Sequence, residues 1–395
     1  MKNIDVTKPM GKNVYATAKG LADKAEEAKK TGDGKTMFQM LADVYDASAA
    51  IISSVQLFAT LTDAIENEET GLTSAIFTSS NEEAKAEAQT LVGTITSGIQ
   101  DYDINDDEVA GLLEQIEKMK TKLRLPGGLD TASDSNPIDV TSVIMSADFG
   151  DEIGDNTIAG WTQSGGKFGE NDYLWVLAYE SWQSKFSINQ DFIGLPAGTY
   201  EVTVSGFCRN GDNQQDYDSY QENPAFSLAY VYAINGDSAV NTVPMAAMAS
   251  YGLTDESIDG VTEFIPTGSE TTYYIPGNLA AAKDMMTADV AKKWVNTVVV
   301  KVLEDGKLSI GIKKDSDLTN SWVVIDDWKL TYFGANSSKE ASGDGATAIS
   351  IVENEPVNVE FFTLDGRKAT RAQKGVIIQK TTLGNGATII KKIMK

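Results

Sequence analysis

Polar and aromatic side chains gather in one short segment in the middle of the chain, residues 209–223 (RNGDNQQDYDSYQEN). Guanidinium, amide and carboxylate groups can form paired hydrogen bonds with neighbouring hydroxyls, and tyrosine rings offer flat apolar faces. That combination is suited to recognising a sugar ring. We therefore predict a ligand-binding loop made by Arg209, Asn213, Asp216, Tyr217 and Tyr220. A solvated loop between two strands would have the same composition.

Tryptophans are the second candidate for stacking on a ligand, and all six lie between residues 161 and 328. Trp175 and Trp328 fall inside alternating strand patterns, so we expect them in a core. Three others fall near expected loops or strand ends, where binding sites on β-sandwiches usually form. These three, Trp161, Trp182 and Trp322, complete the predicted ligand-binding surface.

The chain has no histidine, which excludes Ser-His-Asp and Cys-His catalysis and histidine-ligated zinc or iron. Cys208 is the only cysteine, so no intramolecular disulfide can form, and we expect it to be a small buried residue. Carboxylates are abundant, but no spacing defines the opposed pair that a glycosidase needs. We predict no catalytic residue, and an unrecognised carbohydrate-active hydrolase is kept as an alternative.

The net charge of −24 argues against nucleic acid or an anionic lipid surface as a partner, because both need a cationic face. No uninterrupted apolar run reaches the length of a membrane span, so none is predicted. The first residues, MKNIDVTKPM, lack the apolar segment of a signal peptide. Either the chain is intracellular or it begins after a signal was removed.

Residues 1–125 are predicted to form an antiparallel helical bundle. Steps of three and four residues place one apolar stripe on a long helix, at Met37, Leu41, Val44, Ser48, Ile51, Val55, Phe58, Thr62 and Ile65. Asn81 and Asn105, each followed by acidic residues, are typical helix starts. No helix is assigned to residues 68–80.

Residues 126–137 are predicted to be a linker, after which residues 138–334 carry many short strands typical of a sandwich or barrel. Two β-hairpins are expected there. One joins strands 184–193 and 199–208 through the turn 195–199, and the other turns at Glu304–Lys307. Residues 276–294 are expected to contain a short helix.

The turn LPAGTY at 195–200 and the closing strand SWVVIDDWKLTYF at 321–333 resemble the galactose-binding-like jelly-roll modules that bind sugars. The opening at Ser146–Asp151, followed by Trp161, is also similar to that family. The resemblance implies a central jelly-roll β-sandwich that binds a glycan or polysaccharide. It also implies a structural calcium held by Asp148, Asp151 and Asp327, with Asp326 as a substitute ligand.

Residues 335–346 are predicted to be a second linker, and residues 347–395 a small C-terminal β domain with strands at 347–352, 357–363, 375–380 and 387–394. The run Val359–Arg367, the strand after Lys374 and the lysine-rich end resemble C-terminal sorting domains of the type IX secretion pathway of Bacteroidetes. That resemblance implies an extracellular or cell-surface protein whose tail meets the secretion machinery. A small module covering an exposed sheet edge would have the same strand pattern.

The predicted fold class is thus multidomain, α plus all-β. The predicted function is non-catalytic glycan binding by a secreted or cell-surface protein. The alternatives are a structural or adhesion protein whose sandwich contacts protein, and the hydrolase named above.

Overall fold

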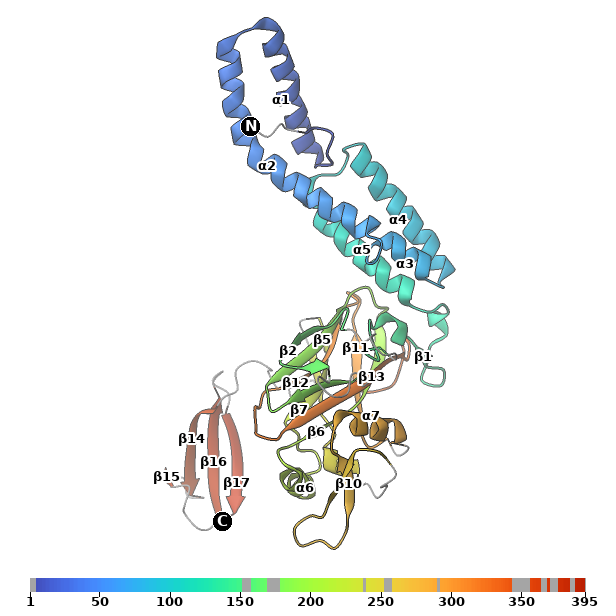
Figure 1. Ribbon diagram of the computed structural model, residues 1–395, viewed down its shortest axis with the longest axis vertical. Helices are drawn as coiled ribbons and strands as arrows, with labels where there is room; N and C mark the ends of the chain where they lie inside the picture. The colour runs from blue at the N-terminus through green and yellow to red at the C-terminus, as the bar shows by residue number, and fades with distance from the viewer. Residues whose placement is uncertain are drawn as a thin grey trace. The chain divides into compact units, whose positions relative to one another are not determined.

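The computed structural model describes residues 5–150, 158–168, 178–236, 239–251, 258–289, 292–342, 356–363, 368–369, 376–383 and 388–394. The chain divides into two compact units, Met1–Gly343 and Asp344–Lys395. Helices and antiparallel sheets are both present, so the protein belongs to the mixed α plus β class that was predicted (Figure 1).

Up to Arg124 the described residues form five α-helices: α1 (Lys12–Thr31), α2 (Gly34–Glu66), α3 (Leu72–Thr78), α4 (Glu82–Gln100) and α5 (Val109–Arg124). The short helix α3 lies within residues 68–80, to which the sequence pattern assigned no helix. Figure 1 shows α1 beside the first half of α2, and α3, α4 and α5 beside its second half. A small apolar cluster around Met10 and Ile51 holds the first group, and a larger one around Phe58 and Leu61 holds the second.

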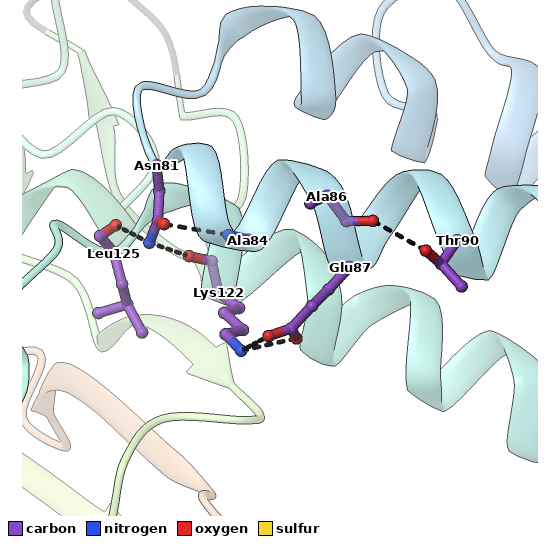
Figure 2. A network of polar contacts seen from close by, with 7 residues as sticks. All are labelled: Asn81, Ala84, Ala86, Glu87, Thr90, Lys122 and Leu125. Atoms are coloured by element: carbon purple, nitrogen blue, oxygen red, sulfur yellow. Dashed lines mark hydrogen bonds and ion pairs between the residues drawn. The ribbon is translucent and has the colours of Figure 1, made fainter.

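Asn81 joins the beginning of α4 to the end of α5 (Figure 2). Its Oδ1 accepts from the backbone N–H of Ala84 at 3.1 Å, which caps α4 as the sequence predicted. Its Nδ2 donates to the carbonyl of Leu125 at 3.0 Å, so it also satisfies the last turn of α5. Lys122 and Glu87 form an ion pair of 2.6 Å between the same two helices.

Replacing Asn81 by alanine should lower the free energy of unfolding by about 1–2 kcal/mol, because both helix ends lose a partner. Asn81→Ser keeps a capping oxygen and loses the donor to the carbonyls of Lys122 and Leu125, so it should cost less than alanine. Urea unfolding followed by circular dichroism measures both variants. Equal stability of wild type and Asn81→Ala would show that the two helix ends are satisfied without this side chain.

Two antiparallel sheets follow the helices. The six-stranded sheet has the order β11-β6-β13-β4-β3 with β1 on β13, and the five-stranded sheet has the order β2-β5-β12-β7-β8. Their strands are β1 (Ile138–Asp139), β2 (Thr162–Ser164), β3 (Lys167–Phe168), β4 (Tyr179–Trp182), β5 (Phe186–Phe192), β6 (Gly198–Arg209), β7 (Ala229–Asn235), β8 (Ala239–Pro244), β11 (Val295–Val302), β12 (Leu308–Lys314) and β13 (Trp322–Tyr332). Alternate residues of both sheets share one apolar core, so the sheets pack face to face.

Both predicted hairpins are corrected by this topology. β5 pairs with β12 and β2, whereas β6 pairs with β11 and β13, so the turn at 195–199 crosses from one sheet to the other. The turn at Glu304–Lys307 crosses in the same way between β11 and β12. The two crossings lie side by side, because the N–H of Leu195 donates to the carbonyl of Gly306 at 3.1 Å. Alternating residues show which face of a strand is buried, but not which strand lies beside it.

A second apolar cluster covers the outer face of the six-stranded sheet. It is built from Trp294, Phe207 and Met285 among others, and Trp294 packs against Phe207 with ring centroids 4.5 Å apart. Its outer wall consists of β9 (Val261–Phe264), β10 (Tyr273–Pro276), α7 (Leu279–Ala288) and a 3₁₀ turn at Met248–Tyr251. Helix α7 confirms the helix expected within 276–294. The sequence pattern predicts a strand at 140–148, but that prediction is wrong, because these residues form a 3₁₀ turn at Thr141–Val143 followed by a bend and turns.

The predicted linker 335–346 is held in place as far as Ser342. Ser342 and Val299 exchange two hydrogen bonds of 2.8 Å, which attaches this segment to the edge strand β11. Lys339 pairs with Glu201, and its Nζ lies 3.8 Å from the ring centroid of Phe333. Asp134, from the first predicted linker, accepts from the N–H of Ser338 at 2.9 Å. These bonds fix both segments against the sandwich.

The second unit contains one four-stranded antiparallel sheet among its described residues, with the order β15-β14-β16-β17. Its strands are β14 (Pro356–Thr363), β15 (Lys368–Ala369), β16 (Val376–Leu383) and β17 (Thr388–Met394). They agree with the strands expected at 357–363, 375–380 and 387–394. The strand expected at 347–352 and the turn Leu364–Arg367 lie outside the described residues, and the resemblance to sorting domains stays a prediction.

Candidate functional site

Three of the predicted ligand-binding residues form a row across the six-stranded sheet. Trp322 at the start of β13 lies opposite Trp182 of β4 on one side and opposite Arg209 of β6 on the other. Residues directly opposite in antiparallel strands point to the same face. The row therefore lies on the outer face, at the edge of the cluster that covers it.

The Arg209 guanidinium lies against both indoles. Its Cζ lies 4.9 Å from the ring centroid of Trp182 and 5.4 Å from that of Trp322. Nε donates to the carbonyl of Asn320 at 3.1 Å and Nη1 to Oδ1 of Asn213 at 3.3 Å. Burial lowers the pKa of Arg209, but an arginine side chain stays charged in a protein. The cation is thus fixed against aromatic faces, where it is stabilised.

Trp182 is the exposed member of the row, with 45% of its surface open to solvent. Gln183, in the amide orientation that satisfies its neighbours, accepts from Nε1 of Trp182 at 2.8 Å and from the N–H of Asn320 at 3.3 Å. Gln183 and Asn320 both have left-handed backbones, with φ of 52° and 63°. Such strain in residues other than glycine persists only where neighbouring contacts hold it. We call Trp182, Gln183, Arg209, Asn213 and Asn320 the Trp182 patch.

The loop that supplies Asn320 is braced from behind. Lys314, fully buried at the end of β12, donates from Nζ to Oγ of Ser321 at 2.9 Å. The Ser321 hydroxyl in turn donates to the carbonyl of Leu318 at 2.6 Å. Burial lowers the pKa of Lys314 because the charged ammonium is poorly solvated there. These bonds fix the loop on which the patch depends.

Trp322 and Trp161 are buried, which corrects the expectation that their rings face a ligand. Trp322 is 4% exposed, donates from Nε1 to Glu180 at 2.7 Å and packs edge-on against Phe207. Trp161 is 7% exposed, lies in the core between the sheets and packs 4.9 Å from Trp328. A position near a strand end therefore did not mean exposure, because both rings turn toward apolar clusters.

Asp216 is also buried, so the expectation that it binds a ligand is corrected as well. Its carboxylate accepts from the N–H of Asn210 at 2.7 Å, from Nδ2 of Asn210 at 3.0 Å and from the N–H of Ala249 at 2.7 Å. Burial raises its pKa to about 6. These bonds join the end of β6, the segment that follows it and the 3₁₀ turn at Met248–Tyr251. Asp216 is thus a positioning residue for the neighbouring patch.

The predicted loop 209–223 is largely a helix, α6 (Asn213–Glu222), with Asp212 as its N-cap. Asn213 of α6 belongs to the Trp182 patch. Tyr217, one turn later, packs 5.8 Å from Tyr273 and 6.2 Å from Phe264 between ring centroids. The cleft beside it measures about 20 Å³, room for about one water molecule. Tyr220 is partly exposed on the same helix.

The predicted calcium ligands are brought together only in part. The N–H of Trp328 donates to the carbonyl of Ala147 at 2.8 Å, which places the segments carrying Asp148 and Asp327 side by side. Asp148 accepts from the N–H of Gly150, and Asp326 pairs with Lys283 at 2.9 Å. Asp151 lies outside the described residues. Among the described residues no three acidic or cysteine side chains cluster as metal ligands, so calcium stays a prediction.

Gln183 and Asn320 are the patch residues that the sequence did not indicate. Neither residue belongs to a polar segment like 209–223. Their left-handed backbone conformations could not be predicted from the sequence pattern. Cys208, by contrast, is buried as expected, and burial raises the pKa of its thiol to about 11.

No protein family profile and no curated protein matches this chain. Among solved structures, one neighbour is described as TmCBM61 in complex with beta-1,4-galactotriose. It is 12% identical with a TM-score of 0.25, over 48% of this chain and 97% of the other. That score is too low to assign the fold or the ligand of that protein to this chain.

Proposed function

We propose that the sandwich binds a glycan without catalysis, at the Trp182 patch, in a secreted or cell-surface protein. The observation that carries the proposal is the half-exposed indole of Trp182, braced by Arg209 and edged by the amides of Gln183, Asn213 and Asn320. An indole left open to water costs free energy that stacking on the C–H face of a pyranose recovers.

The polar groups of the patch suit hydroxyl recognition. Arginine has five N–H donors, and the described bonds to Asn320 and Asn213 engage two of them. Amides both donate and accept, as paired sugar hydroxyls require. A guanidinium, amides and an indole do not replace the two carboxylates of a glycosidase, which is why we propose binding alone.

Trp182→Ala should weaken glycan binding at least about tenfold, because a central aromatic contact is lost. The full chain is titrated by calorimetry against a panel of soluble neutral and uronate-containing polysaccharides. The matched control is Phe226→Ala, which removes another partly exposed ring of the same unit, 41% exposed, and should leave the affinity unchanged.

Two outcomes would contradict the proposal. One is a well-folded chain that binds nothing in the panel, which would favour the alternative of a sandwich that contacts protein. The other is equal binding by wild type and Trp182→Ala, which would place a glycan site elsewhere.

The titrations are run with calcium and with chelator. A melting temperature that falls in chelator would support the proposed ion near Asp148 and Asp327.

A further inference from the structure

The first half of α2 exposes a row of large apolar side chains. The exposed fractions are 78% for Phe38, 42% for Leu41, 79% for Tyr45 and 56% for Ile52. A groove of about 890 Å³ runs along these residues. Contiguous apolar surface of this kind is uncommon on a monomer and usually marks an interaction site.

The row follows a heptad pattern. Phe38, Leu41, Tyr45, Ser48, Ile52 and Val55 are separated by alternating steps of three and four. This spacing forms the seam between helices that pack side by side. We call these six residues the α2 seam.

A different face of α2 is already occupied. Met40, Ile51 and Ser54 are buried, and Ile51 belongs to the small cluster that includes Ala18 of α1. Ser54 accepts from the N–H of Gly11 at 2.8 Å and donates to Asp106 at 2.6 Å. The hairpin of α1 and α2 therefore covers one face of α2. Val55, at the end of the α2 seam, is partly packed against that face, and the rest of the seam is open.

The size of the α2 seam fits a second copy of this chain. With roughly 200 Å² for each large side chain, the exposed fractions of Phe38, Leu41, Tyr45 and Ile52 amount to roughly 500 Å² per chain. Two copies would bury about 1,000 Å², the least area expected of a specific interface. The six seam residues carry no charge, and the charged residues that line the same groove, Asp5, Lys8 and Asp46, include both signs.

A lipid surface fits the same seam less well. By length and composition α2 could cross a membrane, with a mean hydropathy of 1.4 in its most apolar window, but core helices pass the same test. Helices that lie on membranes carry lysine and arginine on the polar face. Between residues 36 and 66, α2 instead carries only acidic charges: Asp43, Asp46, Asp63 and Glu66.

We propose that two copies of this chain associate through the α2 seam, and that the two α1–α2 hairpins form one four-helix assembly. Helical hairpins with one open apolar face commonly complete a core in this way.

Sedimentation equilibrium of the full chain at about 100 µM tests the proposal, well above a dissociation constant of about 10 µM for a small interface. Wild type should have twice the monomer mass of 42.5 kDa. Tyr45→Glu should be monomeric, because it buries a charge at the centre of the seam. The matched control, Phe77→Glu, changes an 89% exposed ring on α3 and should stay dimeric.

Three results would overturn the proposal. A monomeric wild type at this concentration excludes the second copy, and a dimeric Tyr45→Glu places the contact elsewhere. Flotation of a monomeric wild type, but not of Tyr45→Glu, with phosphatidylcholine and phosphatidylglycerol vesicles would make a lipid surface the occupant. Circular dichroism of each variant confirms that α2 is still folded.

Discussion

Replacing Asp216 by alanine should lower the free energy of unfolding by about 3–5 kcal/mol. The alanine leaves three buried donors without their acceptor: the N–H and Nδ2 of Asn210 and the N–H of Ala249. Each such loss costs about 1–3 kcal/mol, and local relaxation recovers part of the sum. Chemical unfolding at pH 7, followed by tryptophan fluorescence, measures the effect.

Asp216→Asn is the informative companion because it keeps the shape and one acceptor oxygen. It should cost less than alanine, and it should leave the patch able to bind whatever wild type binds. If Asp216→Ala unfolds at the same denaturant concentration as wild type, the segment after β6 does not depend on this carboxylate. Asp216 would then not be a positioning residue.

The stability of the first unit should fall by roughly 4 kcal/mol as the pH rises from 5 to 8. Burial raises the pKa of Asp326 to about 7 and that of Asp216 to about 6, from an ordinary value of 3.8. Between the unfolded and folded pKa values the folded chain binds more protons, so stability is lost as the pH rises. Lys283, paired with Asp326 at 2.9 Å, offsets only part of the cost of burying the carboxylate.

Asp326→Asn isolates this contribution. The stability of this variant should stay nearly constant between pH 6 and 8, whereas the stability of wild type should fall over the same range. The hydroxyls of Ser337 and Ser338 lower the pKa of Asp134 to about 2. The stability that Asp134 contributes is therefore lost as the pH falls below about 4, the opposite direction to the effect of Asp326. Melting temperatures recorded across the pH range give both curves. A wild-type curve that rises or stays level from pH 5 to 8 would show that Asp326 ionises normally.

Strand positions could be predicted better than strand partners. The alternation in β5, β6, β11 and β12 located each strand closely, because one face of each is buried in the core between the sheets. The same alternation could not show that both turns cross between sheets. Pairing depends on residues far apart in sequence, such as β6 with β13, which local patterns do not encode.

Only some residues of the candidate site were predicted, because local patterns do not show which distant segments meet. The sequence indicated Trp182, Arg209 and Asn213 by their chemistry, and the sheet register brings them together around Trp322. It also indicated Trp161 and Asp216, which the fold buries. A residue type states what a side chain can do, whereas exposure is decided by what packs against it.

The sequence by itself determined the order of helical and β regions, the absence of histidine chemistry and the buried state of Cys208. It also placed the cap at Asn81, because a cap depends on residues within one turn. Only the tertiary structure decided which tryptophan is exposed and that 209–223 folds as a capped helix against β10. The tertiary structure also decided that the α2 seam remains largely exposed. These outcomes depend on contacts between segments that are far apart in the sequence. The free energy of those contacts comes from burying apolar surface, which a local residue pattern does not reveal.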